Sequence, residues 1–256
     1  MSPAVRVLIV KRVGRSAAVA LAAVFAAVVY AYLTLPDVRP LETVNPSSTA
    51  FIQLRLDEAR DTGKVPKHVQ RWIAYRRIAP ALTRAVLVAE DAAFFQHEGV
   101  DYDELQKSIE LDWARLQLTR GASTITQQLA KNLYLSPSRN PLRKFRELII
   151  ARRLEAELSK RRIFELYLNV IEWGEGIYGA EAAAQTYFHK SASTLTPSEA
   201  ALLAGCIPNP RVMNPLKPTT RLNRRQQMIL SRMGGAVPPV VRASNSLKED
   251  RQNAQK

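Results

Sequence analysis

The stretch from Ser16 to Pro36 carries no charged side chain and consists mostly of alanine, valine, leucine and phenylalanine. About twenty apolar residues in a helix are enough to cross the hydrocarbon core of a bilayer. Basic residues precede this stretch and the first charge after it is Asp37, a bias that places the N-terminus in the cytoplasm. We therefore predict a basic cytoplasmic segment over 1–15, a single transmembrane helix over 16–36 and an exported remainder, with the protein in the inner (cytoplasmic) membrane.

A cleaved signal peptide is the alternative, because the stretch offers small residues at several spacings typical of cleavage sites. The apolar run is longer than the usual signal-peptide core of about 7 to 15 residues. Tyr30 and Tyr32, near its outer end, suit the aromatic belt of a membrane interface. Both alternatives place the rest of the chain outside the cytoplasm.

The composition indicates a folded protein with an anionic partner. Hydrophobic residues make up 46% and charged residues 23% of 256 residues, which is the balance of a globular domain. The net charge of +14 fits nucleic acid, anionic lipid or a phosphorylated substrate, and charge alone does not separate these classes. Cys206 is the only cysteine, so it forms no internal disulfide, and its small apolar neighbours predict burial.

Helical periodicity dominates from Trp72 to Arg232, so the fold class predicted from the pattern is all-α (mainly α). Before it, residues 37–70 form a connector rich in helix-breaking residues, with one short helix expected around Phe51 to Arg60. The globular domain is expected over 71–233. Residues 234–256 are polar and charged after two glycines and two prolines, which predicts a flexible tail.

The first motif is AVLVAEDAAFFQHEG, in which apolar residues lead directly into two acids. A helix from Leu82 would present Glu90, Phe94 and His97 on one face and end at Gly99. A carboxylate at the edge of an apolar cavity can serve as a general base, because desolvation raises its pKa. The alternative is an exposed acidic helix end with a structural histidine.

The second motif is RGASTITQQLAKNLYL, in which Gly121 permits close approach of the backbone and Ser123 is a candidate N-cap. An apolar stripe at helical spacing leaves hydroxyl, amide and ammonium groups on the adjacent face, among them Thr124, Gln128 and Lys131. Ordinary solvated faces favour Glu and Lys over Ser, Thr and Gln. The composition favours a binding face over a merely solvated one.

The third motif, NPLRKFRELIIARRLEAELSKRR, places Arg143 and Glu147 four residues apart on one helix face. With Lys144 and Lys131, Arg143 would form a cationic cluster suited to a diphosphate. The remaining arginines of the segment are expected to form ordinary surface ion pairs: Arg152, Arg153, Arg161 and Arg162.

Two further motifs indicate structure. In ELYLNVIEWGEGIYGAEAAAQTYF, three glycines are expected to separate two helices, and the role of Glu172 beside them is open between function and an ordinary loop acid. In LTPSEAALLAGCIPNP, Thr196 as N-cap, Pro197 after it and Glu199 at the third position predict a scaffold helix with a capping box.

Together these five segments, between about Pro80 and Pro215, resemble in order and spacing the motifs of peptidoglycan glycosyltransferases, the family 51 transglycosylases. The chain is most similar to the monofunctional biosynthetic form. The resemblance implies a lysozyme-like helical domain with a membrane-associated jaw that enters the outer leaflet, carried on the single N-terminal transmembrane helix.

The resemblance also implies roles for individual residues. Glu90 matches the catalytic general base of the family, and Glu147 matches its second essential glutamate, near the donor pyrophosphate. Asp91 matches a neighbour that helps to hold the site and its substrate. The positions that match the lining of the donor site are Ser123, Gln128, Lys131, Arg143 and Lys144.

The implied reaction polymerises lipid II into β-1,4-linked glycan with inversion at the donor anomeric carbon. Lipid II is the acceptor, the growing lipid-linked glycan is the donor, and undecaprenyl pyrophosphate leaves. No cofactor is required, and help from a divalent metal (Mg²⁺ or Mn²⁺) at Glu147 stays open, although no metal-ligand spacing is evident. Membrane lipids and proteins of cell-wall synthesis or division are the other partners expected, with no nucleic acid.

Three other hypotheses remain. A lysozyme-like hydrolase would use the two carboxylates on the same polymer without a lipid-linked donor. A non-enzymatic membrane protein could bind nucleic acid through its basic helices, against the predicted export. Half of a bifunctional penicillin-binding protein would require Ser-x-x-Lys and Lys-Thr-Gly motifs, and the sequence contains neither.

Overall fold

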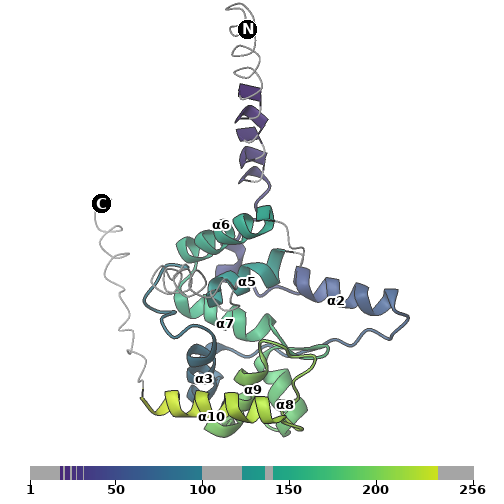
Figure 1. Ribbon diagram of the computed structural model, residues 1–256, viewed down its shortest axis with the longest axis vertical. Coiled ribbons are helices and arrows are strands. Elements are labelled where there is room, and N and C mark those ends of the chain that lie inside the picture. Colours follow the sequence, from purple (N-terminus) through teal and green to yellow (C-terminus); the bar gives the residue numbers. More distant parts are fainter. Residues whose placement is uncertain are drawn as a thin grey trace, which may run out of the picture.

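The computed structural model describes residues 18–99 except 20, 24, 27 and 31, together with residues 123–135 and 141–235. The described part of 18–33 is helical and projects from the body of the protein (Figure 1). Within these ranges, no helix combines the length and the apolar character that a membrane crossing needs. The predicted segment 1–15, part of 16–36 and residues 236–256 of the tail lie outside the described residues, so those predictions stay predictions.

The structure is mainly helical, as predicted, and also contains short 3-10 turns and short strands. Its helices are α2 (Ala50–Asp61), α3 (Pro80–Glu90), α5 (Ile125–Tyr134), α6 (Pro141–Glu157), α7 (Lys160–Val170), α8 (Ala180–Phe188), α9 (Pro197–Cys206) and α10 (Thr220–Gly235). Short 3-10 turns are η1 (Arg39–Glu42), η2 (Tyr75–Arg77) and η3 (Ala192–Thr194). Three short strands are β1 (Val69–Gln70), β2 (Glu172–Gly174) and β3 (Ile177–Tyr178).

The helices pack in two groups that share one core. Helix α9 packs against both α3 and α10, whereas α5 packs against α6 and α7 (Figure 1). Leu82 and Val86 of α3, Leu129 of α5 and Leu154 of α6 are fully buried members of a single apolar cluster. The ends of α3 and α5 therefore meet on a rigid interior, which is what a precisely positioned site requires.

A three-stranded sheet corrects the expectation that the glycines after α7 only separate helices. Strand β3 pairs antiparallel with β2 and parallel with β1, so the order is β1-β3-β2. Gly176, between β2 and β3, has a φ of +68°, and a Cβ there would lie 2.4 Å from the carbonyl oxygen of Lys67. Strands of two or three residues carry no detectable alternation, which is why the periodicity missed them.

The connector is held against the domain. Its predicted helix is present as α2, and Val38 and Leu41 of the connector are buried in the core cluster. Leu35, which was predicted to lie in the transmembrane helix, follows the end of that helix at residue 33 and is buried in the same cluster. Arg162 donates to the carbonyl oxygens of Leu41 at 2.7 Å and Val44 at 3.0 Å. The expectation of an ordinary surface ion pair therefore covers only part of the role of Arg162, because this side chain also fastens the connector to α7.

Helix boundaries differ from the predictions at two motifs. Helix α3 ends at Glu90, and Gly99 lies in a bend with a φ of +81° instead of closing the helix. Thr124, and not Ser123, caps α5 by accepting from the backbone N–H of Gln127. The capping box at the start of α9 is present as predicted, with Thr196 and Glu199 bonded reciprocally, and Cys206 is buried.

Candidate active site

Glu90 is the last residue of α3, and its carboxylate lies between two helices from distant parts of the chain. Gln128 of α5 donates from Nε2 to Oε2 of Glu90 at 3.1 Å, and Arg225 of α10 donates from Nη2 to Oε1 at 3.0 Å. The Glu90 side chain is only 11% exposed. An ionised carboxylate offers about four acceptor positions, so these two donors leave it able to take a further proton.

The amide of Gln128 is oriented by a residue of a third helix. Tyr167 of α7 is completely buried and donates from Oη to Oε1 of Gln128 at 2.9 Å. Burial raises the pKa of Tyr167 well above its usual value, which keeps the phenol protonated as a donor. Because the amide oxygen is taken by Tyr167, the amide nitrogen faces Glu90.

Opposing effects act on the pKa of Glu90. Burial raises it, while the hydrogen bond from Gln128, the hydrogen bond and charge of Arg225, and the charge of Lys131 lower it. Burial is the largest of these effects, and the pKa stays above the usual range for a glutamate. A carboxylate with a raised pKa is a stronger base once ionised, as general-base catalysis near neutral pH requires.

The carboxylate of Asp91 is engaged by groups of the protein itself. Oδ2 accepts from the backbone N–H of Ile125 at 2.9 Å, and Nε2 of His97 lies 3.0 Å from Oδ1. These contacts join the end of α3 to the start of α5 and fix the turn that follows Glu90. Asp91 thus joins the two segments that carry the site, and its role toward the substrate stays a prediction.

Glu147 lies in a separate, strongly charged part of the same region. The residue is 3% exposed, and its carboxylate accepts from Nη1 of Arg143 at 2.9 Å and from Nζ of Lys144 at 2.5 Å. Lys144 also donates to Oγ of Ser123 at 3.3 Å and to Oε1 of Gln127 at 3.1 Å. The second and third motifs therefore meet, as the predicted donor site requires.

Lys131 connects the two carboxylates electrostatically. Burial is the largest effect and lowers the pKa of Lys131, and the charges of Arg143 and Lys144 lower it further. The charges of Glu147 and Glu90 act in the opposite direction. Because the charges of Glu90, Glu147, Arg143 and Lys144 all act on Lys131, these five charged groups belong to one region.

Two residues of the site were missed by the sequence analysis, and a third, Gln127, was part of the second motif but was given no role of its own. Arg225 is 135 positions from Glu90 and lies in an arginine-rich stretch that none of the five motifs includes. Tyr167 falls in a motif that had been assigned to structure, and Gln127 stands beside the predicted Gln128. The adjacent pair of glutamines was the one available signal, because neighbouring residues of a helix point to different sides and can contact different parts of a site.

The arrangement does not favour a divalent metal at Glu147. Both of its oxygens accept from cationic donors, so neither is presented to a metal ion. Across residues 18–99, 123–135 and 141–235, no three His, Cys, Asp or Glu side chains converge as ligands in the described positions. The need for metal in the reaction stays a prediction that this observation does not test.

Comparison with known proteins supports the resemblance seen in the motifs. A family model described as Transglycosylase matches residues 58–234, which is more than half of the chain. That range includes every described residue of the site, from Glu90 to Arg225.

Several curated proteins named "Biosynthetic peptidoglycan transglycosylase" are similar over most of their length. The protein from Nitrosospira multiformis is 48% identical over 195 residues, covering 76% of this chain and 85% of the relative. Those from Dechloromonas aromatica (47% over 196 residues, 77% and 85% covered) and Methylobacillus flagellatus (48% over 195 residues, 76% and 85% covered) are comparable. With a matching family model and relatives at this level of identity, the chain belongs to the transglycosylase family.

Proposed function

We propose that the protein is a peptidoglycan glycosyltransferase that polymerises lipid II into β-1,4-linked glycan strands for the cell wall. The observation that carries this proposal is that Lys131 lies within electrostatic reach both of a buried carboxylate, Glu90, and of the cations Arg143 and Lys144. Transfer from a lipid-linked donor needs both a base for the acceptor and cations for the departing diphosphate. Family membership and the names of the relatives support the same activity.

Glu90 is the general base of the proposed reaction. The 4-hydroxyl of lipid II gives its proton to the Glu90 carboxylate. As the proton leaves, the hydroxyl oxygen forms a bond to the anomeric carbon of the donor. Gln128 and Arg225 hold the carboxylate in place, so little reorganisation is needed as the proton moves. Attack from the face opposite the leaving group inverts the anomeric configuration.

The cationic residues act on the leaving group. When the bond from the anomeric carbon to the phosphate oxygen breaks, undecaprenyl pyrophosphate takes the electron pair and gains negative charge. Arg143 can bind phosphate oxygens with its planar fork, and Lys131 and Lys144 act as point charges. Glu147 accepts from Arg143 and Lys144, and so it positions these two cations toward one another instead of letting them repel.

The same contacts argue against a lysozyme-like hydrolase. A glycosidase needs its second carboxylate as a nucleophile or as a base for water. In this protein Glu147 is 3% exposed and is paired with two cations, which disfavours either role. Glycosyl transfer from a pyrophosphate donor uses both carboxylates and the cations around Glu147. Hydrolysis of a glycosidic bond releases no diphosphate, so it does not need these cations.

The proposal includes a position at the outer face of the inner membrane, with a single N-terminal anchor. Leu142 and Phe145 of α6 are 61% and 42% exposed, which is unusual for large apolar side chains on a charged helix. Arg146 of the same helix donates to the carbonyl oxygen of Thr34, so the end of the N-terminal helix lies against α6. An apolar surface beside the anchor supports contact between α6 and the outer leaflet. A reporter fused after residue 235 tests the topology, and cytoplasmic activity of the reporter contradicts it.

The proposed activity is tested by incubating the full-length protein in detergent with lipid II and resolving the glycan products by length. Wild type should form long strands and release the lipid carrier. Glu90→Gln should bind lipid II and form no polymer, because the amide cannot accept the proton. Glu157→Gln, at an exposed position of α6, is the matched control and should polymerise normally. Polymerisation by Glu90→Gln at the wild-type rate would refute the base assignment, and cleavage of existing glycan by wild type would favour the hydrolase.

A further inference from the structure

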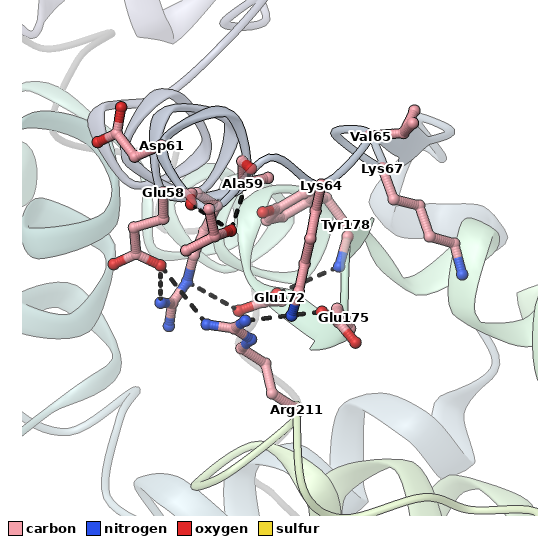
Figure 2. A pocket seen from close by; sticks show the side chains of 13 residues that line it. Glu58, Ala59, Asp61, Lys64, Val65, Lys67, Glu172, Glu175, Tyr178 and Arg211 are labelled. Atoms are coloured by element: carbon pink, nitrogen blue, oxygen red, sulfur yellow. Dashed lines mark hydrogen bonds and ion pairs between the residues drawn. The ribbon is translucent and has the colours of Figure 1, made fainter.

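A second polar pocket lies on a part of the molecule that the proposed reaction does not use. It has a volume of about 590 Å³, within the range typical of small-ligand sites. Residues of α2 from Arg55 onward, the chain after it, the β2–β3 hairpin and Arg211 line it (Figure 2). None of its lining residues belongs to the site around Glu90.

Polar atoms are buried in this pocket without hydrogen-bond partners among the described residues. They are Nε of Arg55, Oε2 of Glu172 and Oη of Tyr178. Arg55 Nε lies 3.4 Å from Glu172 Oε2, an ion pair without hydrogen-bond geometry, and the Glu172 side chain is only 3% exposed. Such atoms are costly to bury, so a ligand that bonded to them would recover free energy lost on folding.

Burial is also the largest influence on the two acidic groups at the floor of the pocket. It raises the pKa of Glu172, against a backbone hydrogen bond from Gly176 and the charges of Arg55 and Arg211. It raises the pKa of Tyr178 as well, so this phenol stays a hydrogen-bond donor. A cationic donor from a ligand would stabilise the ionised form of Glu172.

The pocket carries both signs of charge in equal number. Its cations are Arg55, Lys64, Lys67 and Arg211. Its carboxylates are Glu58, Asp61, Glu172 and Glu175. Figure 2 shows Arg211 directed at Glu58 and Glu175, but the distances of 3.5 and 3.6 Å are long for ion pairs. Lys64 and Lys67 form no ion pair with any described residue, and so they remain available to an anionic group.

This charge pattern selects the class of ligand. A phosphate or other polyanion would meet repulsion from Glu58, Glu172 and Glu175. A divalent metal is disfavoured because no three carboxylates converge as ligands among the described residues. A molecule with one ammonium group and one carboxylate satisfies both halves of the pocket. Val65, which is 91% exposed at the rim, adds an apolar contact for an alkyl side chain.

We propose that this pocket binds a short zwitterionic peptide, of the chemistry found in the amino-acid stems of peptidoglycan sugars. The ammonium group of the peptide donates to Oε2 of Glu172, and its carboxylate accepts from Lys64 and Lys67. The peptide backbone bonds to Tyr178 Oη and Arg55 Nε. The inference rests on the proposed function only for the source of the peptide. Gly176 holds the hairpin tightly against Lys67, and the long contacts of Arg211 leave its side chain able to turn aside as the peptide reaches these buried atoms.

The test is calorimetric titration of the full-length protein in detergent with a synthetic stem pentapeptide that has a free side-chain amine and a free C-terminal carboxylate. Two blocked forms, one acetylated on the amine and one amidated at the C-terminus, probe the two halves separately. Each block, and each of Glu172→Gln and Lys67→Ala, should weaken binding roughly tenfold or more. Asp57→Asn and Arg60→Ala, an exposed ion pair on α2 outside the pocket, are matched controls and should bind as wild type does.

The outcomes separate this inference from the proposed function. Absence of peptide binding by a wild-type preparation that polymerises lipid II overturns the pocket and leaves the function standing. Equal binding by wild type and Lys67→Ala also overturns it, and this exposed residue can be replaced without threatening the fold. Tighter binding of the same peptide on its disaccharide identifies the glycan as the source, whereas equal binding identifies free peptide.

Discussion

Replacement of Arg225 by methionine should move the working pH range of the enzyme upward. Arg225 reaches Glu90 from α10 with a 3.0 Å ion pair and also donates to the carbonyl oxygen of Ala89 at 3.3 Å. Its charge and its hydrogen bond both lower the pKa of Glu90, against the larger effect of burial. Methionine keeps a long side chain at this position and removes the charge. Burial would then raise the pKa of Glu90 further than it does in wild type.

The size of the effect follows from the contact that is lost. A hydrogen bond to a charged group contributes about 1.5 to 3 kcal/mol, and about 1.4 kcal/mol corresponds to a factor of ten in an equilibrium constant. The protonation equilibrium of Glu90 should therefore shift roughly 10- to 100-fold toward the neutral acid. Since only the ionised form accepts a proton, the rate falls by about this factor at pH values below the pKa of Glu90 and recovers at high pH.

The measurement is the pH dependence of the initial rate of lipid II polymerisation for wild type, Arg225→Met and Arg225→Lys. The acid limb should move to higher pH in Arg225→Met and stay closer to wild type in Arg225→Lys. Arg84→Met is the matched control, because Arg84 joins α3 to α10 through the carbonyl oxygen of Met233 without a contact to Glu90. An unshifted profile in Arg225→Met, with the rate reduced equally at every pH, would refute the electrostatic role of Arg225.

Three further substitutions test other parts of the structure. Tyr167→Phe frees the amide of Gln128 and should reduce the rate several-fold with a loss of stability of about 1 kcal/mol; a normal rate in a stable variant would mean that this amide needs no fixing. Lys131→Ala should give shorter strands because the donor is held less firmly, and gel analysis with unchanged strand lengths would remove Lys131 from the donor site. Thr196→Ala removes a capping hydrogen bond and should lower the free energy of unfolding by about 1 kcal/mol in urea titrations without changing activity; unaltered stability would contradict the capping role.

The sequence predicts best what depends on residues close together in the chain. The pairing of Arg143 with Glu147 follows from helical spacing, and the cap at Thr196 follows from a local pattern, so the structure confirms both. The short helix of the connector is also confirmed, because breakers flank it on both sides. All of these predictions rest on the rules of helix spacing and capping. Such rules hold wherever the packing of the fold agrees with the local preference of the chain.

What the sequence could not predict depends on contacts across the fold. No local pattern indicates that Arg225 meets Glu90, or that Arg55 meets Glu172, because each pair is joined only by packing between helices and the hairpin. The end of α3 was placed too late since Phe94 continues the apolar pattern. In the structure Phe94 is buried from a turn and not from a helix.

The charges of the donor site explain why a second glutamate stands among its cations. Lys131, Arg143 and Lys144 carry three positive charges, and Glu147 offsets one, which leaves a net charge of two for the diphosphate. Without Glu147, the three cations would repel one another and turn toward solvent before the donor binds. Glu147→Gln should therefore weaken the donor site without altering the base, so its acid limb should coincide with that of wild type while the maximal rate falls. A shift of that limb would instead place Glu147 in the proton transfer.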